Sequence, residues 1–373
     1  MKIASILGAH LDFVQALPIS QLLRPQHTET LIYPGRYSDF HVARGYVEHL
    51  GIPQPDVHLD IHIGDWDQAF ANLFARLERT LIERQPDLVI VRGGGSPALA
   101  GALAAARLKI PLAHIDGGRR AYCKRGPEEV NRLVADRLAD WVFCSSVMAR
   151  QRLNAEGVCD GVVVSGDVLL DVTQRYLPLA RAHSTILARI GLPSGVYLLA
   201  MVESADTLNN PVRLRGLISA FNAIREPIVL PCGPRLRQAI EQLGLTLATH
   251  ILPIEPVGYL DRLQLINESR AVLTDLDELQ REAYFLSIPC VTLHDTTESP
   301  ETVHVGWNRL AGTQPDQIVS TVRDFQPPRD HPPILGDGHA ADRIVDALNG
   351  QPIEFGYNYG RAPLSLLSLP VAV

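Results

Sequence analysis

The stretch LVIVRGGGSPALAGALAAARLKIPLAHI, residues 88–115, decides the fold class. Leu88–Val91 is an apolar run typical of a buried strand, and Gly93-Gly94-Gly95 breaks it. Pro97–Leu108 is rich in small residues and has a proline near its first turn, which predicts a helix. Leu112–Ile115 is a second apolar run. Continuous apolar strands separated by helices indicate a parallel sheet that is covered on both faces.

The same alternation of strand and helix continues in both directions. Ile3–Leu7 predicts a strand that ends in a turn at Gly8-Ala9-His10, and further strands and helices follow from Val196 to Leu293. Because domains usually run to roughly 100–200 residues, a chain of 373 residues predicts two of them. We therefore expect two Rossmann-like, doubly wound α/β domains, residues 1–168 and 169–349, that face each other across a cleft. We expect the tail, residues 350–373, to pack back on the first domain.

Composition narrows the function classes. The formal net charge of −7 argues against a nucleic-acid partner, because phosphate binding needs a basic face. No apolar run approaches the roughly 20 residues of a membrane span, so we expect a cytoplasmic protein with no membrane partner. The five cysteines show no CxxC spacing, which indicates neither a zinc site nor a disulfide framework. We expect no metal and no cofactor.

Ligands of open α/β sheets bind beyond the carboxyl ends of the strands. His10, Gly94, Asp116, Glu203 and Asp277 all follow predicted strands, so these ends are where chemistry is expected. Each position has a plainer interpretation as well. Glycines after strands are often simple turns, His10 can be an ordinary turn residue, and Asp277 can be the N-cap of the helix that follows it.

Several stretches carry a resemblance to a known family. They include Ile110-Pro111-Leu112-Ala113-His114, Pro127-Glu128-Glu129-Val130-Asn131-Arg132, Leu273-Thr274-Asp275 and Gly306-Trp307-Asn308-Arg309-Leu310. From Met1 to about Leu348 the chain resembles the non-hydrolysing UDP-N-acetylglucosamine 2-epimerases. The resemblance implies two domains of the GT-B type, a homodimer, and interconversion of UDP-GlcNAc and UDP-ManNAc. In that reaction UDP is eliminated across C1–C2 and added back, which requires an acid, a base and a diphosphate site.

The resemblance also assigns candidate positions in the first domain. The family arginine that faces the nucleotide corresponds to His10, and a family aspartate that is an acid/base candidate corresponds to Gly94. A family glutamate corresponds to Asp116, while Glu128 keeps the glutamate of the Pro-Glu-Glu motif. We take Asp116 and Glu128 as acid/base candidates, and His10, Gly94 and Arg132 as ligand-binding candidates.

The second domain departs further from the family pattern. Glu203 stands where the family has a histidine at the diphosphate, and Arg235 belongs to Gly-Pro-Arg in place of His-Pro-Arg. Asp277 and Glu278 replace glycines that cradle the phosphates through backbone N–H groups. Glu282 matches the glutamate that holds the ribose hydroxyls. Glu203 is thus a third acid/base candidate, and the other four are ligand-binding candidates.

The added carboxylates oppose a diphosphate. Like charges about 4 Å apart repel by roughly 1 kcal/mol in water and about 4 kcal/mol near a protein surface. Arginines that can compensate are Arg92, Arg119, Arg120 and Arg235, and we take Arg120 as a further ligand-binding candidate.

Three hypotheses follow. The first is that the chain acts on or binds a different sugar or nucleoside ligand, and the second is that it is an inactive regulatory member, alone or paired with an active paralogue. The third is an ordinary epimerase with displaced functional groups. The retained Asp116 and Glu128 favour the first hypothesis.

Overall fold

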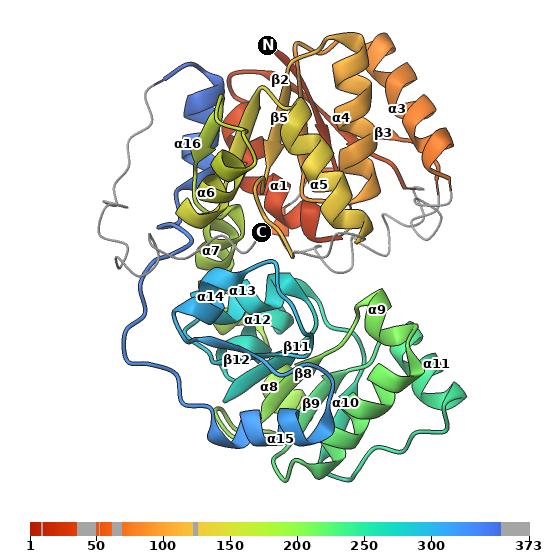
Figure 1. Cartoon of the computed structure of the whole chain (residues 1–373), viewed down its shortest axis with the longest axis vertical. Helices are drawn as coiled ribbons and strands as arrows, with labels where there is room; N and C mark the ends of the chain where they lie inside the picture. The colour runs from red at the N-terminus through yellow and green to blue at the C-terminus, as the bar shows by residue number, and fades with distance from the viewer. Residues whose placement is uncertain (9, 36–49, 52, 62–68, 122–125, 352–373) are drawn as a thin grey trace. The chain divides into compact units, whose positions relative to one another are not determined.

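The computed structural model describes residues 1–8, 10–35, 50–51, 53–61, 69–121 and 126–351. The chain divides into two compact units, each described by itself here (Figure 1). The first unit contains Met1–Val172 and the chain from Pro333 onward, and the second contains Thr173–Pro332. The expected break at residue 168 therefore lies close to the observed one, but the later boundary differs.

The later boundary moves because helix α16 (Ala340–Leu348) belongs to the first unit and not, as expected, to the second. Its apolar face, with Ile344 and Val345, is buried in one cluster with Ile3 and Ile19 of the first unit. Burial of that face decides where the helix packs. The tail that was expected to pack on the first domain, residues 350–373, lies outside the described residues from residue 352 onward.

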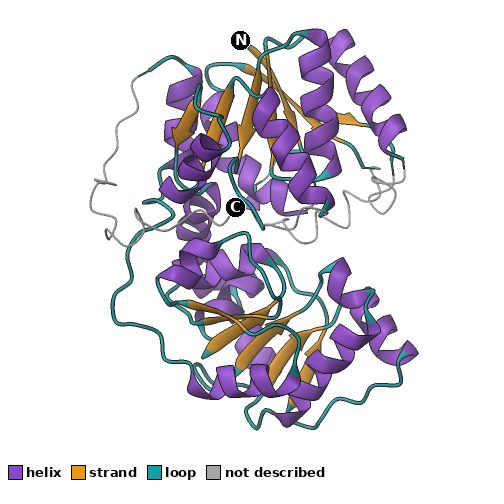
Figure 2. Ribbon diagram, viewed as in Figure 1, coloured by secondary structure: helices purple, strands orange, loops and turns teal. Residues whose placement is uncertain are grey.

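The first unit is built on a seven-stranded parallel sheet with the order β3-β2-β1-β4-β5-β6-β7 (Figure 2). Its strands are β1 (Lys2–Ile6), β2 (Thr28–Tyr33), β3 (Val57–His58), β4 (Leu88–Arg92), β5 (Leu112–Ile115), β6 (Trp141–Cys144) and β7 (Val162–Val164). Its other helices are α1 (His10–Leu23), α3 (Phe70–Arg84), α4 (Ser96–Leu108), α5 (Pro127–Leu138), α6 (Val147–Ala155) and the beginning of α7 (Val168–His183), which continues in the second unit from Thr173. One sheet face packs on α3 and α4, and the other packs on α1 and α16.

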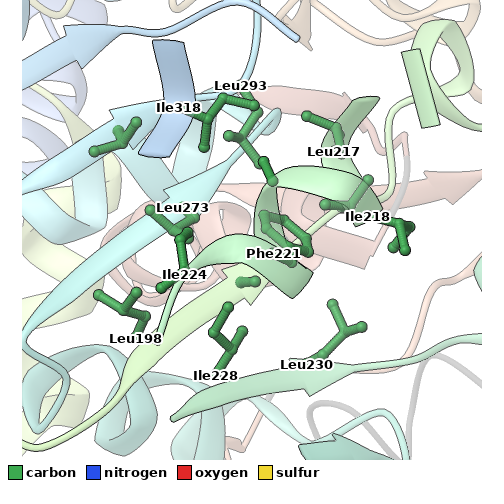
Figure 3. Close-up of a cluster of buried hydrophobic side chains, with 14 of the residues drawn as sticks. Leu198, Leu217, Ile218, Phe221, Ile224, Ile228, Leu230, Leu273, Leu293 and Ile318 are labelled. Carbon is green, nitrogen blue, oxygen red and sulfur yellow. The ribbon is translucent and has the colours of Figure 1, made fainter. Parts of the chain in front are cut away.

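The second unit repeats this plan with a six-stranded parallel sheet of order β10-β9-β8-β11-β12-β13. Its strands are β8 (Leu198–Met201), β9 (Ile228–Pro231), β10 (Ile251–Ile254), β11 (Ala271–Thr274), β12 (Cys290–Thr292) and β13 (Asn308–Leu310). Its helices are α8 (Ile186–Ile190), α9 (Ala205–Leu208), α10 (Pro211–Ala223), α11 (Pro234–Gln242), α12 (Tyr259–Asn267), α13 (Asp277–Phe285), α14 (Pro300–His304) and α15 (Pro315–Asp324). Figure 3 shows part of the core of this unit, a buried cluster to which α10 contributes Leu217 and Phe221, α15 contributes Ile318, and β8 and β11 contribute Leu198 and Leu273.

Both sheets confirm the predicted class of two doubly wound α/β domains. The strand order reverses between β1 and β4 in one sheet and between β8 and β11 in the other. Such reversal points are where ligands of this fold bind. The turn expected at His10 is wrong, because this residue begins α1. Phe13, Val14, Ala16 and Leu17 are all buried, so the helix lacks the amphipathic spacing by which a helix is recognised in a sequence.

Candidate functional site

At the reversal point of the first sheet, the loops after β4 and β5 are held together. The N–H of Gly93 donates to the carbonyl of Ile115 at 3.0 Å, and a ring nitrogen of His114 lies 2.9 Å from the carbonyl oxygen of Gly93. Asp116 follows directly on β5 in the left-handed backbone region, with φ of 63°, and only 6% of it is exposed. A non-glycine residue in this region is uncommon and clusters at functional sites.

A buried polar network holds the loop after β5 in place. Asp136 on α5 lies 2.7 Å from Nδ1 of His114, and it accepts hydrogen bonds from Arg120 at 2.7 Å and from the N–H of Gly118 at 3.2 Å. Burial alone would raise the pKa of Asp136, but His114 and Arg120 hold it below its usual range. The network therefore sets the path of the chain around Asp116.

Arg120 has a structural role that the sequence did not indicate. Its guanidinium is 2% exposed and also donates to both carboxylate oxygens of Glu156, at 2.9 and 2.7 Å. Its guanidinium contacts Asp136, Glu156 and the carbonyl of Arg119, and its contact with a ligand stays a prediction.

Helix α5 brings Glu128 and Arg132 beside the glycine loop. A Cβ atom at Gly94 would lie 2.7 Å from the carbonyl oxygen of Glu128 and 2.9 Å from Nε of Arg132. The Asn131 side chain also donates to the carbonyl of Gly94 at 2.8 Å. Gly94 is therefore needed for close packing of the loop on α5. The Glu128 side chain is 64% exposed and lies 3.4 Å from Arg132, which leaves it accessible to a ligand.

Arg92, the last residue of β4, is the unexpected feature of this reversal point. It is 3% exposed, and its three guanidinium nitrogens are buried without a hydrogen-bond partner among the described residues. Burial lowers the pKa of Arg92, while Asp12, Glu29 and Asp116 raise it. The sequence had singled it out as one of several arginines that can compensate for lost cations, but nothing in the sequence showed that it is buried and unpaired.

The reversal point of the second sheet is dominated by carboxylates. Asp275 follows β11 and accepts hydrogen bonds from the backbone N–H groups of Glu203 at 3.1 Å and Ser204 at 3.3 Å. Burial raises the pKa of Asp275, although these hydrogen bonds and one from Thr207 lower it. Glu203 reaches solvent. Its pKa is nevertheless raised, chiefly because surrounding protein displaces water; Arg262 lowers it, while Glu278 and Asp275 raise it.

Helix α13 begins at this point. The residue before it is Leu276, and no side chain caps the helix, so the expected N-cap role of Asp277 is wrong. Asp277 accepts instead from Ser299 at 2.7 Å and from Arg281 at 3.0 Å. Arg281 thus neutralises one of the two carboxylates in the first turn, while Glu278 remains partly exposed beside it.

Glu282 lies one turn further along α13 and is completely buried. Arg262 on α12 donates to it at 2.5 Å, and the Arg262 guanidinium carbon lies 5.4 Å from the centroid of the Tyr259 ring. Burial raises the pKa of Glu282, and Arg262 and Tyr259 lower it. Arg262 was missed in the sequence because it belongs to no recognisable motif.

Two ligand-binding candidates remain. The side chain of one lies outside the described residues, and the other lies apart from the polar groups at the two reversal points. His10 begins α1, and its side chain lies outside the description. Arg235 is exposed in the first turn of α11. Within the described ranges, no group of three His, Cys, Asp or Glu residues is arranged to hold a metal ion. No described helix is long and apolar enough to span a membrane.

Two doubly wound domains, each with polar side chains at its strand reversal point, define a two-domain Rossmann-like α/β protein of the GT-B type. The family model of UDP-N-acetylglucosamine 2-epimerases matches residues 23–349, and the chain belongs to that family.

Individual relatives match over nearly the whole chain. A Pseudomonas aeruginosa UDP-2,3-diacetamido-2,3-dideoxy-D-glucuronate 2-epimerase is 36% identical over 93% of this chain and 99% of its own length. A UDP-N-acetylglucosamine 2-epimerase homolog of Methanococcus maripaludis is 33% identical with the same coverage. The crystal structure of Methanocaldococcus jannaschii UDP-GlcNAc 2-epimerase, with UDP-GlcNAc and UDP, has a TM-score of 0.87 at 30% identity, covering 94% of this chain and 100% of that one.

Proposed function

We propose that this member of the UDP-N-acetylglucosamine 2-epimerase family acts on or binds a sugar or nucleoside ligand other than UDP-N-acetylglucosamine. The observation that carries the proposal is the first turn of α13, where Asp277 and Glu278 stand at positions that the family resemblance gives to phosphate-cradling glycines. Both side chains are partly exposed. Nearby, the N–H groups of Glu203 and Ser204 donate to Asp275, and the N–H of Leu276 donates to the hydroxyl of Thr274 at 3.0 Å.

Charge at the second reversal point supports the same conclusion. Among the described side chains, the carboxylates of Glu203, Asp275 and Glu278 approach no arginine closely enough for an ion pair, in contrast to Asp277 and Glu282. Carboxylates of this kind suit the hydroxyl groups of a ribose or a sugar, because they accept hydrogen bonds from them. A diphosphate would be repelled by them.

The first unit supplies the groups for proton transfer in this proposal. Asp116 and Glu128 keep two carboxylates there, one buried at a strained backbone position and one exposed. Glu203, at the reversal point of the second sheet, is a separate acid/base candidate. Its raised pKa favours the protonated form more than in an ordinary glutamate, which suits a group that must hold and release a proton. The relative from Pseudomonas aeruginosa, by its name a 2-epimerase of a diacetamido-glucuronate, supports a changed sugar within the family.

Incubation with UDP-GlcNAc in D2O tests the proposal. We expect neither deuterium at C2 of the sugar by NMR nor release of UDP. A thermal-shift panel of UDP, uridine, free amino sugars and UDP-uronates should then show stabilisation by a ligand other than UDP-GlcNAc. The variant Glu282→Gln, which changes the buried carboxylate, should weaken that response.

Two results would contradict the proposal. Deuteration of UDP-GlcNAc with release of UDP would identify an ordinary epimerase. Silence toward every compound would favour a regulatory subunit. The homodimer implied by the family resemblance, or a pairing with an active paralogue, belongs to the same proposal and is tested by light scattering and co-purification.

A further inference from the structure

We propose that Arg92 is an oxyanion receptor, which binds a carboxylate or phosphate group of the ligand at the reversal point of the first sheet. The inference rests on the proposed function, because it assumes a sugar or nucleoside ligand, and it adds the chemistry that this ligand must carry. Burying the Arg92 guanidinium without a partner costs free energy. A buried guanidinium without partners loses its hydration and gains no hydrogen bonds in return.

The carboxylates around Arg92 do not offset that cost by direct contact. Asp12, Glu29 and Asp116 affect it electrostatically, but no described residue forms a hydrogen bond or ion pair with it. Glu29 is committed elsewhere, because it accepts from Ser5 at 2.7 Å, Ser20 at 3.0 Å and Arg24 at 3.0 Å. Asp116 is fixed by its backbone conformation and by the network beneath its loop.

The position of Arg92 is that of a binding group. It ends β4 at the reversal of strand order, where ligands of doubly wound sheets bind. The next residue, Gly93, is partly exposed, and a Cβ atom built on it would meet no atom within 4 Å. The loop that follows Arg92 in the chain therefore has open space on one side, although the guanidinium nitrogens themselves are buried.

The chemistry of the side chain defines the class of ligand group. A guanidinium is planar, permanently charged and presents five N–H donors, which match the paired oxygens of a carboxylate or phosphate. Lysine offers a charge but not the paired geometry. An oxyanion at Arg92 would supply the missing acceptors close to Asp116, which follows Ile115, the residue paired with Arg92 in the sheet.

The test compares wild-type protein with Arg92→Met and Arg92→Lys, with Arg107→Met as a control for removal of a charge from the surface of the same unit. Isothermal calorimetry would measure the Kd of UDP-GlcNAc, UDP, UDP-glucuronate and free glucuronate. We expect Arg92→Met to weaken at least one anionic probe by about tenfold or more, as loss of hydrogen bonds to a charged group implies. Arg92→Lys should lose part of this affinity, and Arg107→Met none.

The probes separate the two sources of the oxyanion. Weakening confined to the two glucuronates assigns Arg92 to a sugar carboxylate, and weakening of UDP assigns it to a phosphate. Thermal melts separate binding from folding: Arg92→Met should melt no lower than wild type, because it removes an unpaired buried charge.

Three outcomes would contradict the inference, and the measurements distinguish them. Wild-type protein that binds a probe with the same Kd as Arg92→Met would overturn the inference and leave the proposed function standing. Wild-type protein that binds none of these anionic probes would overturn the inference, and it would overturn the proposed function as well only if the thermal-shift panel were also silent. A large fall in the melting temperature of Arg92→Met would show that Arg92 is a structural residue and would also overturn the inference.

Discussion

Asp275 accepts a hydrogen bond from the backbone N–H of Glu203 at 3.1 Å, across the point where the strand order of the second sheet reverses. A carboxylate therefore stands between the loops after β8 and β11, where a doubly wound fold commonly places a phosphate. The Asp275 side chain affects both the fold and the choice of ligand, because it holds the loop after β8 in place and accepts hydrogen bonds from the N–H groups of that loop.

Replacement of Asp275 by alanine should separate these two effects. We expect a loss of about 1–3 kcal/mol in the free energy of unfolding, because the N–H groups of Glu203 and Ser204 lose their acceptor. We also expect UDP to bind about fivefold more tightly, since removal of a like charge is worth roughly 1 kcal/mol. Urea denaturation and calorimetry measure the two quantities.

The matched control is Asp295→Ala. Its side chain is 68% exposed and makes one ion pair with Arg213 at 3.4 Å, so the stability change should stay below about 1 kcal/mol. Unchanged stability and unchanged UDP affinity in Asp275→Ala would show that the carboxylate neither holds the loop nor blocks a phosphate.

Asp116→Asn should remove the acid/base function of this side chain and leave the fold unchanged. The residue has φ of 63°, a region that asparagine also tolerates, so the free energy of unfolding should change by less than about 0.5 kcal/mol. With a ligand that the thermal-shift panel identifies and that exchanges a proton in D2O, turnover should fall by about 10²–10⁴-fold, the usual contribution of a general acid or base.

Asp116→Ala provides the contrast, because alanine lacks the local hydrogen bonding that stabilises this backbone region. It should lose roughly 1–2 kcal/mol of stability as well as activity. Turnover of Asp116→Asn equal to that of wild type would remove Asp116 from the acid/base set.

Stability should depend on pH through Asp171, in the first turn of α7. Its oxygens accept from the N–H groups of Ala340 and Ala341 at 3.1 and 2.7 Å, where α16 begins. Burial raises its pKa to about 6 from 3.8, despite these hydrogen bonds. The folded state thus holds the proton more tightly than the unfolded state, so this group's contribution falls as pH rises from 3.8 to about 6.

Urea denaturation at several pH values measures whether the stability falls as the pH rises. From pH 3.8 to about 6, the free energy of unfolding of wild-type protein should fall by up to about 3 kcal/mol relative to that of Asp171→Asn. At higher pH we expect no further fall. Asp160→Asn, at an exposed position of the same unit, should follow wild type. A difference between wild type and Asp171→Asn that does not vary with pH would contradict the prediction.

Much of the fold was predictable from local sequence. The strand Leu112–Ile115 has the predicted bounds, and the strand predicted at Leu88–Val91 and the helix predicted at Pro97–Leu108 each differ by one residue at one end. Each is an apolar run or an amphipathic repeat bounded by glycine, proline or a polar residue, which are signals that neighbouring residues carry. The helix at His10 was missed because burial on several sides removes the periodicity.

The sequence by itself therefore determined the class of fold, the family and the strand ends at which polar side chains gather. Tertiary structure decided what those side chains do. It paired Arg120 with Asp136 and Glu156, turned Asp277 toward Ser299 and Arg281, and left Arg92 buried without a partner among the described residues. Strands and helices follow from the order of neighbouring residues, but charge pairing and burial depend on residues far apart in the chain.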